Sequence, residues 1–362
     1  MLDQLEAQSP DALLALIKMY AQDPRDDKID LGVGVYRTND GATPVFRSIK
    51  AAEQRLVDTQ DSKSYLGPEG DTGFVDALKP YIFGKDATMG GRLEGMQTPG
   101  GTGAVRLAVA LGKAAGITRI HLGTPSWPNH IPIIEDVGLE AVTFQHSNAD
   151  GSADVDALLE IVRQGREGDA VLIHACCHNP SAIDYTHEQW DAIADALADS
   201  PVLPIIDSAY QGLGTGLEED AAGLRKVLAK VPYALIAYSC DKNFGLYRDR
   251  VGAFYAKVAE PAQMAAAMSN AAALAREALQ RADDEVKSNS KRIAASRLRK
   301  MAGGKELADK VDVAADEQEK AIATAEKALD EVTNPADEKA LKGSLTALQL
   351  GEFQKAIDEA KK

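Results

Sequence analysis

Two charged residues stand directly behind apolar runs, where an unpaired charge would be costly to bury. Lys242 follows the run Ala234-Leu-Ile-Ala-Tyr-Ser-Cys-Asp. It can be an amine that forms a Schiff base with a carbonyl group, or a surface lysine at the start of a loop. Asp207 follows Ile205-Ile. Its carboxylate can keep a pyridinium nitrogen protonated, which makes the ring an electron sink, or it can cap a helix.

A glycine-rich turn and a tryptophan flanked by prolines are further candidates for binding. Thr98-Pro-Gly-Gly-Thr-Gly-Ala-Val-Arg106 should open a helix after Gly103, and N–H groups at a helix N-terminus bind phosphate. The turn lacks the Walker A lysine and the G-x-G-x-x-G spacing, so a purely structural turn remains an alternative. Trp127, in Pro125-Ser-Trp-Pro, can stack on a planar ring or plug a gap in the core.

The segment His174-Ala-Cys-Cys-His-Asn-Pro180 contains residue types that bind metals, but their spacing does not match that of zinc sites. Alternate residues of a strand face opposite sides, so we expect these four side chains not to converge on one ion. The sequence therefore predicts no metal site. Asn179 before proline marks the expected end of a strand, where the ligand sites of parallel sheets lie.

Near-continuous apolar runs alternate with amphipathic stretches up to about residue 258. Strands are predicted at 119–122, 170–174, 202–206 and 234–238, and helices at 158–166, 188–197 and 222–230. Runs that are apolar throughout are typical of strands buried on both faces, so the pattern predicts an α/β fold with a mostly parallel sheet. From about residue 260 the pattern predicts helices only, as a thin bundle, a projecting arm or a partly disordered tail.

Composition and charge narrow the classes of partner. The 362 residues are long enough for two or three domains, and they carry a net charge of −15. An acidic surface and the lack of a long apolar run disfavour nucleic-acid and membrane partners. The first residues do not resemble a signal peptide, and three cysteines do not make a disulfide framework. We therefore expect a reduced, cytoplasmic protein.

Taken in order, the motifs resemble those of the aspartate/aromatic aminotransferases, a class I family of fold-type I that depends on pyridoxal 5'-phosphate. The match rests on G-G-T-G-A at 100–104, P-S-W-P-N-H at 125–130, C-C-H-N-P at 176–180, D-x-A-Y-Q-G at 207–212 and K-N-F-G-L-Y-x-x-R-V-G at 242–252. D-L-G-V-G-V-Y at 30–36 and S-Y-L-G-P-E-G at 64–70 extend it over about residues 1–276. The resemblance implies transfer of an amino group between aspartate or an aromatic amino acid and a 2-oxo acid.

The resemblance also implies a role for each matching residue. Lys242, Asp207 and Tyr210 would be catalytic: the lysine holds the cofactor and moves a proton, the aspartate pairs with the ring nitrogen, and the tyrosine binds the ring hydroxyl oxygen. The remaining cofactor-binding residues would be Asn179 at the ring oxygen, Trp127 stacked on the ring, and Gly101, Thr102, Ser239 and Arg250 at the phosphate. Tyr65 would reach that phosphate from the neighbouring subunit of a homodimer. Gly34 and the neighbour's Arg276 would contact the amino acid or 2-oxo acid.

In domain terms, the resemblance implies an N-terminal arm and small-domain segment at 1–45 and a large, three-layered cofactor-binding domain at 46–258. A long helical segment at 259–302 and a helical tail at 303–362 would follow. The sequence departs from the family mildly in three places and severely in a fourth. Ser181-Ala follows Asn179-Pro where the family has threonine and glycine, and Ser208 follows Asp207 where an aromatic or other apolar residue is common. Asp241 stands where a serine usually precedes the lysine, and an anion there would favour the charged form of Lys242.

Beyond Arg276 the match stops, and with it the small-domain arginine that would grip the substrate α-carboxylate. This change suggests a truncated, fused or artificial chain. Two further hypotheses therefore stand beside the active enzyme: a protein that binds the cofactor but turns over poorly, and a scaffold in which the helical tail mediates assembly.

Overall fold

The computed structural model describes residues 12–25, 27–29 and 34–278 of the chain. These residues belong almost entirely to one compact unit, which ends at Ala275, and Arg276 begins a second unit. The predicted tail at 303–362 and most of the segment at 259–302 lie outside the described residues. Of that segment, residues 264–278 are helical, as expected. Within the described residues, no helix has the length and apolar character needed to cross a bilayer.

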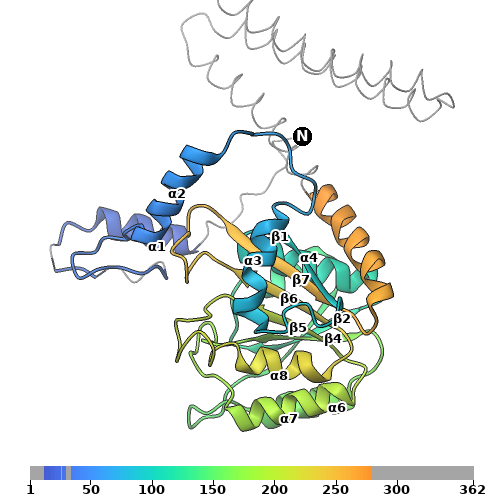
Figure 1. Ribbon diagram of the computed structural model, residues 1–362. Helices are drawn as coiled ribbons and strands as arrows, with labels where there is room; N and C mark the ends of the chain where they lie inside the picture. Colours follow the sequence, from blue (N-terminus) through green and yellow to red (C-terminus); the bar gives the residue numbers. More distant parts are fainter. Residues whose placement is uncertain (1–11, 26, 30–33, 279–362) are drawn as a thin grey trace, which may run out of the picture. The chain divides into compact units, whose positions relative to one another are not determined.

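A single seven-stranded sheet forms the centre of the first unit, in the order β1-β7-β6-β5-β4-β2-β3 (Figure 1). The strands are β1 (Leu93–Pro99), β2 (Arg119–Thr124), β3 (Glu140–Gln145), β4 (Asp169–His174), β5 (Leu203–Ser208), β6 (Ala234–Ser239) and β7 (Val251–Lys257). Strand β7 is antiparallel to both β1 and β6, whereas the other pairings are parallel. The prediction of a mostly parallel sheet is therefore confirmed, and the four predicted strands correspond to β2, β4, β5 and β6.

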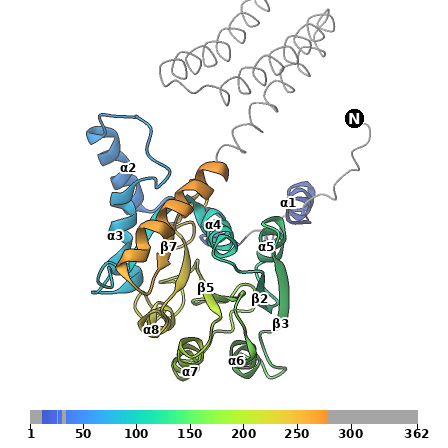
Figure 2. The same ribbon diagram turned by 90° about the vertical axis from the view of Figure 1, so that its right-hand side faces the viewer.

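Helices cover both faces of this sheet and complete three layers (Figures 1 and 2). One face carries α3 (Thr72–Phe83), α6 (Val155–Gln164), α7 (His187–Ala198) and α8 (Ala222–Lys230). The opposite face carries α4 (Gly100–Ala114), α5 (His130–Asp136) and residues 264–275. Two N-terminal helices precede them, α1 (Ala12–Gln22) and α2 (Arg47–Thr59). The first unit is thus an α/β sandwich, as the sequence predicts.

Successive residues of the central strands enter different cores. Because side chains alternate across a strand, Val171 and Ile173 of β4 join the core under α6, α7 and α8, while Leu172 joins the core under α4. The same alternation continues in β5, where Ile206 and Ile205 enter opposite cores. Both faces of each strand are apolar as a result, which explains the near-continuous apolar runs in the sequence.

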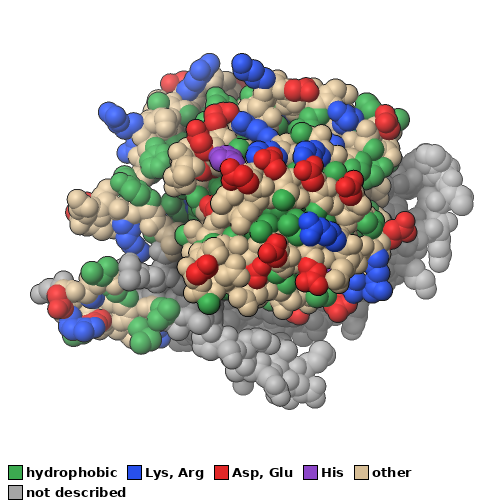
Figure 3. Space-filling model, turned by 90° about the horizontal axis from the view of Figure 1, so that it is seen from below, with side chains coloured by type: hydrophobic (Ala, Val, Ile, Leu, Met, Phe, Trp, Pro, Cys, Tyr) green, Lys and Arg blue, Asp and Glu red, His purple; other side chains and the backbone are tan. Residues whose placement is uncertain are grey.

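Helices α7 and α8 pack closely because a glycine of α8 leaves room for a tryptophan of α7. A Cβ atom on Gly223 would lie 2.3 Å from the indole of Trp190, which is buried. Lys226 pairs with Asp191 at 2.8 Å across the same two helices. Figure 3, seen from the side of these helices, shows acidic and basic side chains interspersed on the surface. Such exposed ion pairs add little stability, so apolar packing holds this layer.

Two predicted boundaries differ from the structure. Helix α4 begins at Gly100 rather than after Gly103, because Gly100 adopts a φ of +70° that turns the chain directly from β1 into the helix. Strand β4 ends at His174, so Asn179 lies in the following loop and does not mark the strand's end. The first difference shortens the connection between β1 and α4, whereas the second places Asn179 in the loop at the carboxyl edge of the sheet.

Replacing Gly223 by alanine should destabilise the protein by about 1–3 kcal/mol, since the added methyl group overlaps Trp190. Gly112→Ala in α4 is the matched control. Its added Cβ would meet the nearest neighbouring atom at 3.6 Å, so a gain of about 0.5–1 kcal/mol is expected from the higher helix propensity of alanine. Denaturant titration followed by circular dichroism measures both. Equal effects of the two substitutions would contradict this account of the α7–α8 contact.

Candidate active site

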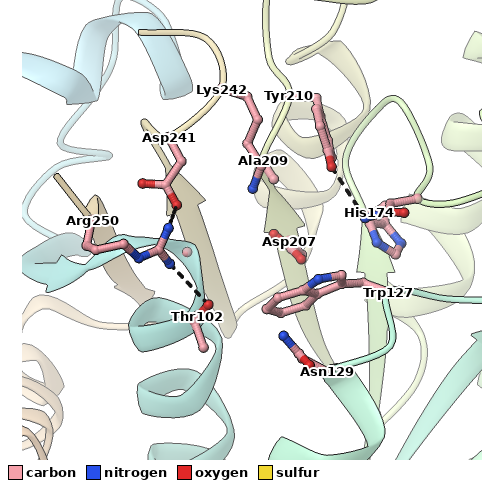
Figure 4. A pocket seen from close by; sticks show the side chains of 12 residues that line it. Thr102, Trp127, Asn129, His174, Asp207, Ala209, Tyr210, Asp241, Lys242 and Arg250 are labelled. Atoms are coloured by element: carbon pink, nitrogen blue, oxygen red, sulfur yellow. Dashed lines mark hydrogen bonds and ion pairs between the residues drawn. The ribbon is translucent and has the colours of Figure 1, made fainter. Parts of the chain in front are cut away.

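A cavity of about 240 Å³ opens at the carboxyl edge of the sheet (Figure 4). It is lined by residues from five separate stretches of the chain, namely Gly101, Thr102, Trp127, Asn129, His174, Asn179, Asp207, Ala209, Tyr210, Asp241, Lys242 and Arg250. Parallel strands bring their carboxyl ends to one edge, and the loops after β1, β2, β4, β5 and β6 meet there. Because β7 runs in the opposite direction, its first residues lie at the same edge, which places Arg250 in the cavity.

Most residues that the sequence singles out meet in this cavity. Lys242, Asp207, Tyr210, Gly101, Thr102, Trp127, Asn179 and Arg250 line it. Ser239 is completely buried, and its Cβ would lie 2.8 Å from a Cβ on Gly101, so it stands directly behind the lining. Gly34, Tyr65 and Arg276 are exposed and are not among the lining residues. The sequence resemblance had already assigned Tyr65 and Arg276 to a neighbouring subunit.

Asp207 is a buried carboxylate held by a histidine from a distant helix. It is 5% exposed, and its Oδ2 lies 3.1 Å from Nε2 of His130, the first residue of α5. The other ring nitrogen of His130 lies 2.9 Å from Oγ of Ser126. With Ser126 donating to Nδ1, Nε2–H of His130 donates to Asp207, and both hydrogen bonds are satisfied. Asp207 thus pairs with an imidazole and does not cap a helix.

Burial alone would raise the pKa of Asp207, because it penalises the charged carboxylate. The hydrogen bond from His130, together with the nearby charge of Lys242, outweighs burial, and the pKa of Asp207 lies below its ordinary value. A carboxylate that stays ionised inside an apolar setting is a strong partner for a positively charged or protonated group. The cavity therefore holds a fixed negative charge at the end of β5.

Lys242 points into the cavity between Asp241 and Tyr210 (Figure 4). Its Nζ lies 5.2 Å from the centre of the Tyr210 ring. The hydroxyl of Tyr210 accepts a hydrogen bond of 3.3 Å from Nδ2 of Asn179. Burial and the nearby negative charges, Asp207 first among them, raise the pKa of Tyr210. The tyrosine therefore remains a neutral hydroxyl that can donate to an oxygen in the cavity.

The opposite end of the cavity is built on the first turn of α4. A Cβ on Gly100 would lie 2.6 Å from Nη2 of Arg250, so the guanidinium rests directly against the backbone there. Nη2 also donates to Oγ1 of Thr102 at 3.3 Å. The free N–H groups of a helix N-terminus, a hydroxyl and a guanidinium together form a set of donors suited to an anion. Asp241 forms an ion pair with this same arginine.

Histidines pack against one another behind the cavity. The rings of His174 and His178 lie 4.5 Å apart, and His178 stacks on His146 at 3.6 Å. Burial lowers the pKa of His174 to about 4 and that of His178 to about 3. These imidazoles are therefore neutral near pH 7, and they fill space beside Asp207 without adding charge.

The residues around β4 are closer together than regular strand alternation would allow. Both cysteine sulfurs lie within 4.8 Å of each other and of a carboxylate oxygen of Asp220. The side chains of Cys176 and Cys177 turn the same way because β4 has ended at His174 and Cys177 has a φ of +48°. The expected alternation therefore fails after His174. His174 instead groups with His130 and Asp207 on the cavity side, again within 4.8 Å.

Four lining residues were not predicted as site residues: Asn129, His174, Ala209 and Asp241. His130, which holds Asp207, was not predicted either. His130 and His174 both lie in segments that the sequence analysis identifies as motifs. A histidine at the start of an apolar helix or at the end of an apolar strand is the pattern that could have marked them as site residues. His130 lies 77 residues before its partner Asp207 in the sequence, and the groups beside His174 also come from other segments. No local sequence pattern could therefore reveal these contacts.

Residues 26–314 match the family model described as aminotransferase class I and II. Over 277 residues the chain is 48% identical to a tyrosine aminotransferase of Rhizobium meliloti (strain 1021), covering 76% of this chain and 71% of that protein. Over 257 residues it is 42% identical to an aspartate aminotransferase of Escherichia coli (strain K12), covering 70% and 65%. The family match therefore extends beyond Arg276, where the sequence motifs stop.

Solved structures agree with these matches. An aromatic amino acid aminotransferase with 3-indolebutyric acid superposes with a TM-score of 0.73 at 42% identity, over 76% of this chain and 71% of that one. An aromatic-amino-acid aminotransferase from Burkholderia pseudomallei, described as covalently bound to pyridoxal phosphate, gives a TM-score of 0.73 at 29% identity, over 76% and 70%.

The free energy of unfolding should fall as the pH drops from about 6.5, the ordinary histidine value, to about 4, where His174 titrates. In that window the unfolded chain binds protons that the buried, neutral imidazoles do not, so acid favours unfolding. His174→Gln should reduce this dependence, with exposed His187→Gln as the control. Denaturant midpoints across the pH series, with imidazole NMR shifts, measure it. A protonated His174 in the folded protein at pH 6 would contradict the prediction.

Proposed function

The chain belongs to the class I and II aminotransferases, and we propose that it transfers an amino group between aspartate or an aromatic amino acid and a 2-oxo acid. Relatives that are 42–48% identical carry the names aspartate, tyrosine and aromatic-amino-acid aminotransferase, which supports both substrate types. The observation that carries the proposal is a single cavity in which the amine of Lys242 lies between the buried carboxylate of Asp207 and the anion-binding turn of α4.

The residues present fit pyridoxal 5'-phosphate. Asp207 offers an ionised carboxylate at one end of the cavity, suited to a protonated ring nitrogen. At the other end Gly101 leaves space that a side chain would fill, since a Cβ there would meet Ser239 at 2.8 Å. A phosphate can therefore approach the backbone N–H groups closely. When bound, the cofactor supplies an aldehyde that takes up an amino group and a ring that withdraws electrons from the reacting carbon.

Each lining residue has a role that follows from its position. Lys242 would hold the cofactor through its amine and would move the proton at the substrate Cα as general base and acid. Asp207, held by His130, keeps the ring nitrogen protonated. Tyr210, positioned by Asn179, donates a hydrogen bond to the ring oxygen. Trp127 packs edge-on against His130 at 5.1 Å, which fixes its indole as a plate for the ring.

At the phosphate end, we assign the donors to Gly101, Thr102, Ser239 and Arg250. The first two contribute from the first turn of α4, where orphan N–H groups and the helix dipole favour negative charge. Arg250 adds a planar fork that matches a phosphate. Ser239 is buried against this turn, and its hydroxyl already accepts a hydrogen bond of 3.2 Å from the backbone N–H of Asp241. Its O–H remains available to donate.

A homodimer would complete the site. Helix α2 has no buried residue, and it exposes Leu56 (54%) and Val57 (77%), close in sequence to the fully exposed Tyr65. An apolar helix face of this kind is typical of an interface. In the proposed dimer, Tyr65 of one subunit reaches the phosphate end of the cavity in the other subunit. Arg276 likewise contacts the substrate bound in the other subunit, and Gly34 lies in the loop that closes over substrate. The expected cytoplasmic location remains a prediction from the sequence.

Adding pyridoxal phosphate to the apoprotein should produce the visible absorption band that its aldehyde gains on condensing with an amine. Aspartate or phenylalanine should then bleach this band as the amino group is taken up. Lys242→Ala should abolish the protein-bound band and lower turnover by about a thousandfold or more, because the proton-transfer group is lost. Absorption spectroscopy and an amino-acid/2-oxo-acid assay measure the two effects.

Lys85→Ala, at an exposed position after α3, is the control for loss of a lysine elsewhere. A band that survives Lys242→Ala unchanged would refute the assignment of Lys242. A normal band that neither amino acid bleaches would instead support the cofactor-binding protein of poor turnover. No band under any condition would leave the scaffold hypothesis, which the comparisons do not favour.

Subunit complementation tests the shared site. Tyr65→Ala should weaken pyridoxal phosphate binding, and Lys242→Ala should remove turnover. At a pyridoxal phosphate concentration too low to load the Tyr65→Ala variant, mixing the two variants under conditions of subunit exchange should restore about a quarter of wild-type activity, since half of the dimers are mixed and each has one intact site. Light scattering establishes the dimer independently. If mixing restores nothing although mixed dimers form, Tyr65 acts within its own chain or not at all.

A further inference from the structure

Asp241 is an acidic residue placed among the donors for an anion. It is 2% exposed, lines the cavity and immediately precedes Lys242. One carboxylate oxygen, Oδ2, pairs with Nη1 of Arg250 (Figure 4). The other, Oδ1, is buried and has no hydrogen-bond partner among the described residues. Burying a carboxylate with one unpaired oxygen lowers the stability of the folded protein unless the site gains something from it.

The carboxylate lies at the position where the phosphate donors converge. A Cβ on Gly100 would lie 3.1 Å from Oδ2 of Asp241 and 2.6 Å from Nη2 of Arg250, so the ion pair rests on the first turn of α4. This turn provides orphan N–H groups and the positive end of the helix dipole, which explains how a buried anion is tolerated there. Asp241 thus uses the same electrostatic environment that a bound phosphate requires.

Arg250 cannot serve both anions equally well. Its Nη1 is taken by Asp241, and its Nη2 donates to Oγ1 of Thr102. A phosphate entering here would have to displace the carboxylate or share the guanidinium with it. In the second case two negative charges would lie side by side, which is unfavourable in a partly desolvated cavity. Either outcome subtracts from the free energy of phosphate binding.

We propose that Asp241 is an internal competitor for the phosphate-binding donors and weakens the affinity of this site for the phosphate group of its cofactor. This inference rests on the proposed function, because the ligand is the phosphate of pyridoxal phosphate. It predicts a protein whose cofactor is held mainly through the ring and Lys242, and which exchanges its cofactor more readily than a site with a neutral residue at 241.

Two variants separate charge from shape. Asp241→Asn keeps the size of the side chain and removes its charge, while Asp241→Ser also removes the bulk and leaves a hydroxyl donor. Both should lower the dissociation constant for pyridoxal phosphate by about tenfold or more, since a like charge beside the phosphate is removed and Arg250 is released. Exposed Asp249→Ser, in the same loop and of the same charge change, should leave the constant at its wild-type value.

Pyridoxal, which has the same ring and aldehyde but no phosphate, provides the decisive comparison. Titrations of the apoproteins, followed by visible absorption, should show unchanged affinity for pyridoxal in both variants and a gain only for pyridoxal phosphate. An equal gain for both compounds would overturn the proposal, because the effect would then act on Lys242 instead of the phosphate. Unchanged or weaker pyridoxal phosphate binding in both variants would also overturn it.

Binding of inorganic phosphate, measured by calorimetry, keeps this test independent of the proposed function. Asp241→Ser should bind phosphate more tightly than the wild type even if neither protein condenses with an aldehyde. In an Arg250→Ala background the gain from Asp241→Ser should shrink, since the released guanidinium is no longer there to bind the anion. A full gain without Arg250 would show that the ion pair is not the cause.

Discussion

Burial of the central sheet on both faces is the constraint on which the rest of this molecule depends. Strands β4, β5, β6 and β7 give alternate residues to two apolar cores, so neither face can carry polar chemistry without a high cost of desolvation. Polar groups are therefore confined to the edge where the strands end. Because β7 is antiparallel to its neighbours, its first residues lie at this edge too, and the loops converge on one cavity.

Within the cavity, two carboxylates lie at separate ends, with the amine of Lys242 between them. Asp207 is held by His130 at the end of β5, and Asp241 is held by Arg250 at the first turn of α4. The buried, neutral imidazoles of His174 and His178 fill space near Asp207 without adding charge, whereas Arg250, which we propose as a phosphate donor, is already paired with Asp241. One end of the cavity is thus prepared for its ligand group, and the other must exchange partners.

The single chain supplies all the residues that line the described cavity, but Tyr65 and the apolar residues of α2 do not contact it. Tyr65 is fully exposed, and α2 buries none of its residues although it carries exposed leucine and valine. A monomer gains nothing from such a surface, whereas an interface would bury it and bring Tyr65 to a second site. Exposure in the isolated subunit and a proposed role across the interface are therefore consistent with each other.

The fold class followed from the sequence because apolar runs that alternate with amphipathic stretches reflect local physics: a strand between two helical layers must be apolar throughout. The same holds for Lys242, Asp207, Tyr210, Trp127 and the glycine-rich turn, which the motifs place at strand ends and which do line the cavity. The start of α4 was less accurate, since Gly100 in the left-handed region turns the chain directly from β1 into the helix, and Asn179 lies in the loop after β4 and not at the end of the strand.

Only the tertiary structure decided which side chains are partners. His130 meets Asp207 across 77 residues, and Asp241, which the sequence places beside Lys242, turns to Arg250 instead. A sequence specifies which residues favour a strand, a turn or a buried position, because these preferences depend on neighbours along the chain. Contacts between loops depend on the order and direction of the strands, and here the reversed strand β7 is what delivers an arginine to an aspartate at the phosphate end.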